Sequence, residues 1–191
     1  MVRSNETLAQ LVAGLESPDE WWRSRSFRLR CERADGGAAR ELERLAVEAK
    51  LPETRGLALR VLQRLERTTV GTLTTALRDP HPGVREQALA IAGDVLRQMP
   101  ELVAPVLATA NDSDARVRFC SALVLGSIAD AAAVPALAQI AVRDGLDRWT
   151  RAAVLSGVGS RLGAFRAAVQ AARDQNPAAF AAVMENLGRV F

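Results

Sequence analysis

The residue types that most often build metal, thiol or redox sites are scarce in this 191-residue chain. It has two cysteines, Cys31 and Cys120, and one histidine, His81, which are far apart and lack metal-ligand spacing. Neither cysteine lies in a Cys-x-x-Cys-His motif for haem attachment. We therefore predict no catalytic residue, no metal site and no cofactor. We interpret His81, between two prolines, as a turn residue, and expect two buried thiols outside disulfide reach.

A segment rich in arginine and aromatic residues, 21–33, is the best candidate for binding a polyanion. Arginines neutralise phosphates and aromatic rings stack on bases, so the segment is compatible with nucleic acid. A structural interpretation competes, because Trp22 aligns with Val84 and Val117 in the repeats described below, which indicates a core residue. The candidate binding surface comprises Trp21, Arg23, Arg25, Arg28, Arg30, Arg33 and, from a later segment, Trp149.

Arginines also recur along the whole chain, at intervals of 32, 30, 33 and 33 residues. The residues three and four positions after each arginine are small or, with few exceptions, apolar, and lie on one face of a helix. This period is typical of helical repeats. The recurring arginines are Arg23, Arg55, Arg85, Arg118 and Arg151.

Two interpretations of the recurring arginines stay open. They could form a binding ladder on the inner surface of the repeats. Alternatively, they form a structural ladder, in which each guanidinium pairs with a turn aspartate of its own or a neighbouring repeat. The aspartates placed to accept such bonds are Asp19, Asp79, Asp112, Asp114 and Asp147.

An amphipathic segment precedes each arginine-bearing helix, with apolar residues at three- and four-residue spacing, as at Val134, Leu137 and Ile140. Short connections make consecutive helices antiparallel, and no segment has the alternation of a strand. We predict an all-α fold, a right-handed alpha-alpha superhelix (HEAT/ARM-like solenoid) of about six antiparallel helix pairs in one domain, 1–191. The approximate repeats are 4–34, 37–66, 69–98, 100–129, 131–160 and 162–191.

Glycines form a partial column eight residues after the recurring arginines. They stand at Gly93, Gly126 and Gly159 in three consecutive repeats. A small residue there permits close helix contact or ends a helix.

Composition bounds the remaining possibilities. The chain is 49% hydrophobic and 25% charged, which predicts a folded protein, and its formal net charge of +3 is only a weak indication of a polyanionic partner. The apolar stretches are too short to span a bilayer, and the N-terminus lacks a signal-peptide pattern. We expect a soluble, cytoplasmic chain, or a periplasmic one if it is excised from a larger exported protein.

The phrases Asp79-Pro80-His81-Pro82-Gly83-Val84-Arg85 and Asp112-Ser113-Asp114-Ala115-Arg116-Val117-Arg118 resemble the HEAT-repeat pattern. More narrowly, Trp21-Trp22-Arg23 and residues 143–155 are similar to the HEAT segment of planctomycete-type haem-binding dehydrogenase-like proteins. That resemblance implies a spacer or docking segment of a larger redox protein. Its chemistry lies in domains that this sequence does not contain, so no catalytic residue is carried over.

Together these observations predict a non-catalytic scaffold that binds another protein, or another domain of a larger protein, through the concave surface of a helical solenoid. The alternative is a nucleic-acid-binding protein. It could include DNA glycosylase activity, because HEAT-like glycosylases resemble this architecture and Trp149, Asp147 and Arg151 are a conceivable cluster of that kind. A second alternative, an accessory to cofactor or pigment attachment, rests on fold resemblance to the phycobilin-lyase HEAT proteins.

Overall fold

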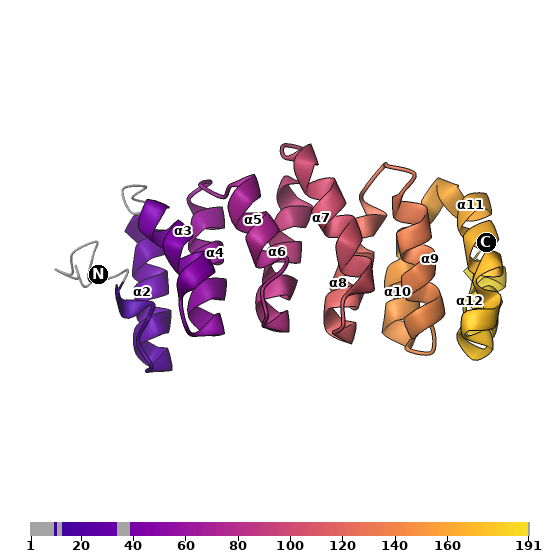
Figure 1. Ribbon diagram of the computed structural model, residues 1–191, viewed down its shortest axis with the longest axis horizontal. Helices are drawn as coiled ribbons and strands as arrows, with labels where there is room; N and C mark the ends of the chain where they lie inside the picture. The colour runs from indigo at the N-terminus through magenta and orange to yellow at the C-terminus, as the bar shows by residue number, and fades with distance from the viewer. Residues whose placement is uncertain (1–9, 11–12, 34–38, 191) are drawn as a thin grey trace. The chain divides into compact units, whose positions relative to one another are not determined.

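The computed structural model describes the backbone of residues 10, 13–33 and 39–190, and their side chains except those of 29–33 and 189–190. Every secondary-structure element in this part of the chain is a helix, and none is a strand. Helix follows helix through short connections (Figure 1). The predicted fold class, an all-helical HEAT-like solenoid, is confirmed.

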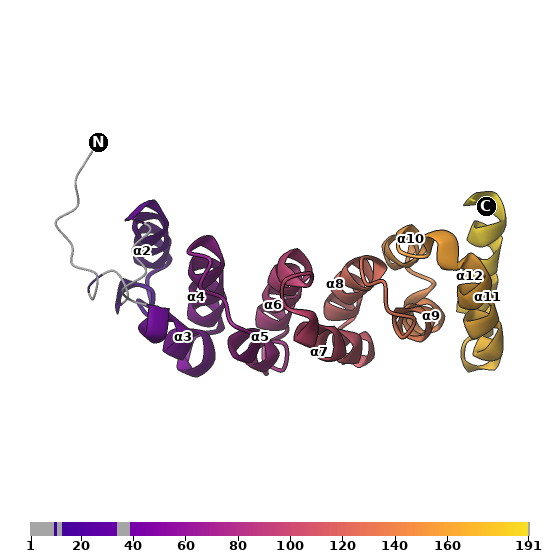
Figure 2. The ribbon, with the colours of Figure 1, turned by 90° about the horizontal axis from the view of Figure 1, so that it is seen from above.

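The chain forms two compact units, Met1–Ile91 and Ala92–Phe191. In the first unit, α2 and α4 lie in one layer, and α3 and α5 lie in the other (Figure 2). Helix α3 packs against both α4 and α5, and α2 packs against α4. The helices are α2 (Glu20–Arg33), α3 (Ala39–Glu48), α4 (Pro52–Arg64), α5 (Val70–Ala76) and α6 (Pro82–Val95), whose last residues belong to the second unit.

The second unit repeats this two-layer arrangement, with α8 and α10 in one layer and α7 and α9 in the other (Figure 2). Helix α9 is its centre: it packs against α8, α10, α11 and α12, and eight of its twelve residues are buried. The α-helices are α7 (Val103–Ala108), α8 (Ala115–Gly126), α9 (Ala133–Asp144), α10 (Arg148–Ser156), α11 (Leu162–Ala171) and α12 (Pro177–Val190). Short 3₁₀ helices are η2 (Pro100–Leu102), η3 (Thr109–Asn111), η4 (Gly159–Arg161) and η5 (Arg173–Gln175).

Side chains at the helix starts explain where several helices begin. The carboxylate of Asp114 accepts hydrogen bonds from the backbone N–H groups of Arg116 and Val117 at the first turn of α8. Asp147 and Thr69 cap α10 and α5 in the same way. A cap satisfies N–H groups that have no partner within the helix. Asp114 and Asp147 therefore fix the boundary between the two helices of a pair, and Thr69 fixes the start of a pair.

One column of the repeat is buried along the whole described chain. The residue three positions after each recurring arginine faces the interior, whether it is alanine, serine or valine. Its small size lets neighbouring helices approach each other, while leucines from the first helix of each pair fill the remaining space. The buried column is Ser26, Ala58, Ala88, Ser121 and Val154.

None of the described helices has the length and apolar character that crossing a membrane requires.

The glycine column needs a correction. Gly126 of α8 faces Gly157, at the end of α10, so closely that a Cβ built on Gly157 would lie 2.5 Å from the Gly126 Cα. Gly159, the residue predicted from the spacing, instead begins η4 with φ of 49°. Helix α10 ends at Ser156, and the close contact is made by Gly157, two residues before the glycine of the column.

Replacing Gly157 with alanine should therefore destabilise the second unit. The added methyl group overlaps backbone rather than a flexible side chain, so we expect the free energy of unfolding to fall by about 1–3 kcal/mol. Gly163→Ala is the matched control, because Gly163 lies in α11 with nothing within 4 Å of its built Cβ. Alanine there should leave stability unchanged or raise it by about 0.5 kcal/mol. Urea unfolding followed by circular dichroism measures both, and equal effects would contradict the close contact.

Candidate functional site

All five recurring arginines make the same bond with the backbone. The Nη1 group of each donates to the carbonyl oxygens six and five residues earlier, at distances of 2.6–3.3 Å. The last carbonyls of a helix and the turn after it lack intrahelical partners, so the guanidinium satisfies them. The accepting pairs are Ser17 and Pro18, Ala49 and Lys50, Asp79 and Pro80, Asp112 and Ser113, and Gly145 and Leu146.

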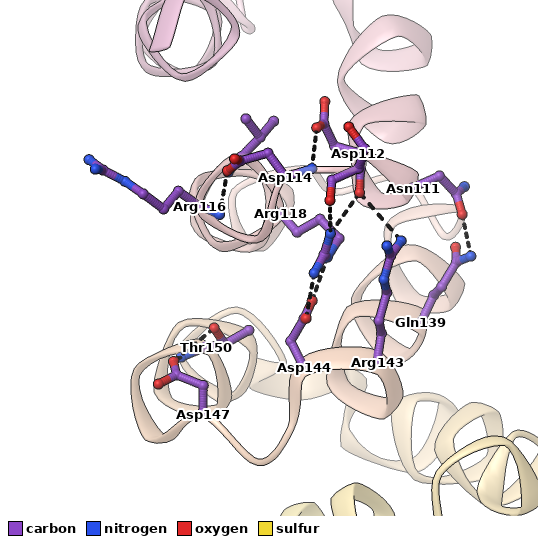
Figure 3. Close-up of polar contacts among 12 residues, drawn as sticks. Asn111, Asp112, Asp114, Arg116, Arg118, Gln139, Arg143, Asp144, Asp147 and Thr150 are labelled. Atoms are coloured by element: carbon purple, nitrogen blue, oxygen red, sulfur yellow. Dashed lines mark hydrogen bonds and ion pairs between the residues drawn. The ribbon is translucent and has the colours of Figure 1, made fainter. Parts of the chain in front are cut away.

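Two of these arginines also bind a carboxylate of the following repeat. Nε and Nη2 of Arg118 donate to the two oxygens of Asp144, both at 2.6 Å (Figure 3). Arg55 binds Asp79 in the same two-pronged way, at 2.6 and 2.8 Å. All four side chains are at most 13% exposed, so these ion pairs are shielded from solvent. The carboxylate hydrogen bond raises the pKa of each arginine above its ordinary value, so both stay charged.

The aspartates named from the sequence have different roles. Asp79 binds a recurring arginine through its carboxylate, whereas the partner of Arg118 is Asp144, which the sequence did not single out. Its signal was its position, at the end of the first helix of the next repeat, where it is near the preceding arginine in space. The carboxylates of Asp19, Asp112, Asp114 and Asp147 accept backbone N–H groups within their own turns.

Arg151 differs from Arg118, the other recurring arginine of the second unit. Its Nη1 bonds to the carbonyls of Gly145 and Leu146, but its buried Nε has no hydrogen-bond partner. A further arginine, Arg161, was missed by sequence reasoning because it lies outside the repeat spacing. It donates to the carbonyls of Gly126, Ile128 and Gly157, at the other ends of α8 and α10.

The basic and aromatic segment of the first unit has tryptophans on its surface. Trp21 and Trp22 are 60% and 46% exposed, with ring centroids 4.8 Å apart in an edge-to-face arrangement. The guanidinium of Arg25 lies 5.6 and 5.8 Å from these two rings. The prediction that Trp22 is a core residue is wrong: Val84 and Val117 are buried at that position, but the indole packs on Trp21 and Arg25 instead.

The other described arginines of this segment make no cation–π contact with the two tryptophan rings. Arg23 is held by the carbonyls of Ser17 and Pro18, and Arg28 is exposed. The side chains of Arg30 and Arg33 lie outside the described residues, as does that of Cys31. Trp149 belongs to the second unit.

Trp149 lines a groove of about 710 Å³ between α8 and α10. Its indole is 61% exposed, and Leu146, in the turn before α10, is 62% exposed. Phe119 of α8 supplies a third apolar side chain to the lining. Sequence reasoning missed Leu146 and Phe119, although a leucine in the otherwise polar turn 144–147 was a usable signal.

Charged residues surround this groove. Its two carboxylates are engaged within the chain, Asp144 by Arg118 and Asp147 by the backbone and hydroxyl of Thr150 (Figure 3). The backbone hydrogen bond from Thr150 is the main cause of a lowered pKa at Asp147, with the hydroxyl second. Arg116 and Arg143 are exposed members of the lining. Just outside it, the guanidinium of Arg148 lies 4.4 Å from the centre of the Trp149 ring.

The remaining chemically capable residues are ordinary in their surroundings. His81 is exposed, and its Nδ1 accepts the backbone N–H of Gly83 within the turn. Cys120 is a half-buried thiol. Among the residues described, histidine, cysteine, aspartate and glutamate side chains do not gather in threes that could hold a metal ion.

The consecutive antiparallel helices, with arginines anchored at each turn, define the class of protein as a HEAT-like helical solenoid. Within the chain, residues 70–159 match a family described as HEAT repeats. No curated protein matches the sequence. HEAT repeats are commonly protein-interaction scaffolds and typically non-catalytic.

The different surroundings of Arg118 and Arg151 predict different costs of removing them. Arg118→Met leaves Asp144 without its partner and should lower the free energy of unfolding by roughly 3 kcal/mol. Arg151→Met removes only bonds to two carbonyls and should cost about 1 kcal/mol. Chemical denaturation of both variants gives the comparison. If the Arg151 variant were the less stable of the two, the ion pair would not be the stabilising contact. Replacing Asp144 as well, in Arg118→Met/Asp144→Leu, should recover part of the loss.

The lowered pKa of Asp147 makes the start of α10 sensitive to acid. Because the folded state favours the charged carboxylate, its stabilising contribution is present above the ordinary pKa of 3.8 and is lost as pH falls through the lower folded-state value. We expect Asp147→Ala to lower Tm near neutral pH, and expect the difference from the parent chain to shrink in acid. Asp147→Asn keeps a capping oxygen and should be milder than alanine. A Tm difference that is independent of pH would contradict this role.

Proposed function

We propose that this chain is a non-catalytic protein-interaction module, which binds a partner protein, or another domain of a larger protein, through the face formed by its arginine-bearing helices. One observation carries the proposal. All three tryptophans of the chain are exposed, by 60%, 46% and 61%, and all three lie in arginine-bearing helices. Tryptophan is the residue type most enriched in the energetic centres of protein interfaces, and exposing it without a partner is unfavourable.

The recurring arginines support the same proposal indirectly. Each is bonded to backbone carbonyls of its own repeat, and two are also bonded to carboxylates. We infer that they form a structural ladder, whose charges hold helices together rather than facing a ligand. The exposed aromatic side chains are then the better candidates for contact with a partner.

Photo-crosslinking of the full chain tests this proposal. A photoreactive residue in place of Trp21 or Trp149 should give a discrete, saturable adduct with a protein, whereas one in place of Arg97, which is also exposed, should not. The adduct should then be reproduced with the purified partner. No protein adduct from either tryptophan position, or equal labelling from position 97, would overturn the proposal.

A nucleic-acid surface is the second candidate, favoured by the contact of Trp21, Trp22 and Arg25 and by the exposed Arg28 in the same helix. It predicts that labelled single- or double-stranded DNA binds more weakly as salt rises, because releasing counterions into a more concentrated salt solution is less favourable. Trp21→Ala and Arg28→Ala should weaken the binding, and Trp149→Ala, in the other unit, should not. Fluorescence anisotropy at low and moderate salt measures this. Binding at neither salt would eliminate the candidate.

A further inference from the structure

The groove beside Trp149 has the features of a docking site for an acidic peptide with a bulky apolar side chain, and we propose that this is what the second unit binds. The inference rests on the proposed function, because it assigns the partner chemistry of one interaction surface. The argument depends on the apolar floor of the groove, on which of its charges are already engaged, and on its contrast with the groove of the first unit.

The floor of the groove suits a large apolar side chain. Phe119, Leu146 and Trp149 face a volume of about 710 Å³, which is far larger than a single side chain and open enough to admit a short peptide. More than half of the surface of both Leu146 and Trp149 is exposed. Covering them would remove apolar area from water, which favours binding in proportion to that area.

The charges of the groove select against a basic peptide. The Asp144 carboxylate is bound by both Nε and Nη2 of Arg118, and the Asp147 carboxylate accepts the Thr150 N–H and hydroxyl. Both oxygens of Asp144 are engaged, whereas both Thr150 bonds to Asp147 go to Oδ1 (Figure 3). A cationic side chain entering the groove would therefore have to compete with these donors.

The exposed cations of the groove favour carboxylates. Arg143 gives one long bond, 3.3 Å, to the Asp112 carbonyl, which leaves most of its five N–H donors for another acceptor. Arg148 stacks on the Trp149 ring, and a guanidinium stacked in this way still presents its edge to a carboxylate.

The corresponding groove of the first unit lacks this combination. Its volume is about 360 Å³, and its lining includes the acidic residues Glu20 and Glu53 together with Arg60 and His81. No tryptophan lines it. Of these two grooves, the one between α8 and α10 is the one that combines an exposed aromatic floor with exposed arginines, which is why we assign the acidic peptide to it.

Selection of short random peptides displayed on phage against the full chain tests the assignment. We expect the enriched sequences to contain an aromatic or large aliphatic residue flanked by aspartate or glutamate. A synthetic peptide of the enriched sequence should bind the protein in an anisotropy assay, and its affinity should fall as salt rises. Enrichment of basic sequences, or of none, would overturn the proposal.

Variants with matched controls locate the binding. Leu146→Ala and Trp149→Ala should each weaken peptide binding at least about tenfold, whereas Leu123→Ala, which removes a 50% exposed leucine of α8, should not. Arg148→Glu should also weaken it, and Arg97→Glu should not. Because a negative charge in the first turn of α10 favours the helix, loss of binding in Arg148→Glu would not be explained by unfolding. Equal affinity of all variants would overturn the proposal.

The two proposals fail separately. A protein that crosslinks from position 21, in a chain whose peptide binding ignores Trp149, would remove the acidic-peptide groove and leave the interaction module standing. A chain that crosslinks no protein from either position would remove the module itself. Tight binding of DNA that is lost in Trp149→Ala would replace the peptide with a polyanion at the same groove.

Discussion

The bond between each recurring arginine and two backbone carbonyls is the interaction on which the rest of this fold depends. An α-helix ends with carbonyl groups that have no partner, and a solenoid of short helices has such an end at every turn. Placing an arginine early in the second helix of a pair satisfies the end of the first helix with one side chain. The turn is then held at both sides, because the cap residue binds the N–H groups of the second helix while the arginine binds the carbonyls of the first.

Once the turn is fixed, the remaining donors of the guanidinium can reach the next repeat. Arg118 shows the complete arrangement: Nη1 serves its own turn, and Nε with Nη2 serves Asp144. One side chain thus links three segments, which is possible because the guanidinium is planar and its donors diverge. The glycine contact between Gly126 and Gly157 at the other ends of α8 and α10 complements it, since those ends approach too closely for side chains. Arg161 closes that end by binding the carbonyls that the contact leaves exposed.

The fold was largely predictable from sequence because its determinants are local and repeat. An arginine, a small residue three positions later and a preceding amphipathic segment recur in each repeat, and each copy confirms the others. Contacts between repeats were less predictable. Asp144 is separated from Arg118 by 26 residues. The aspartates beside the turns were the obvious partners, but carboxylates such as that of Asp147 accept backbone N–H groups as helix caps. The prediction that Trp22 is a core residue failed for a related reason. An alignment column predicts burial only where a neighbouring helix covers that face, and here the indole packs on surface neighbours instead.

The groove beside Trp149 was also predicted only in part from the sequence. The sequence identified Trp149 but not Leu146 or Phe119, because their meeting depends on how α10 lies beside α8. It also placed the candidate binding arginines in the segment 21–33, and not at Arg116, Arg143 or Arg148. Arginines in the recurring position are bound to backbone carbonyls, and Arg55 and Arg118 are also paired with a carboxylate. Arg116, Arg143 and Arg148 lie at the start or end of a helix, outside that position, and stay exposed. In the proposed peptide site, the exposed arginines beside Trp149 contribute more to attraction than the formal net charge of +3, because charges act on a partner mainly at short range.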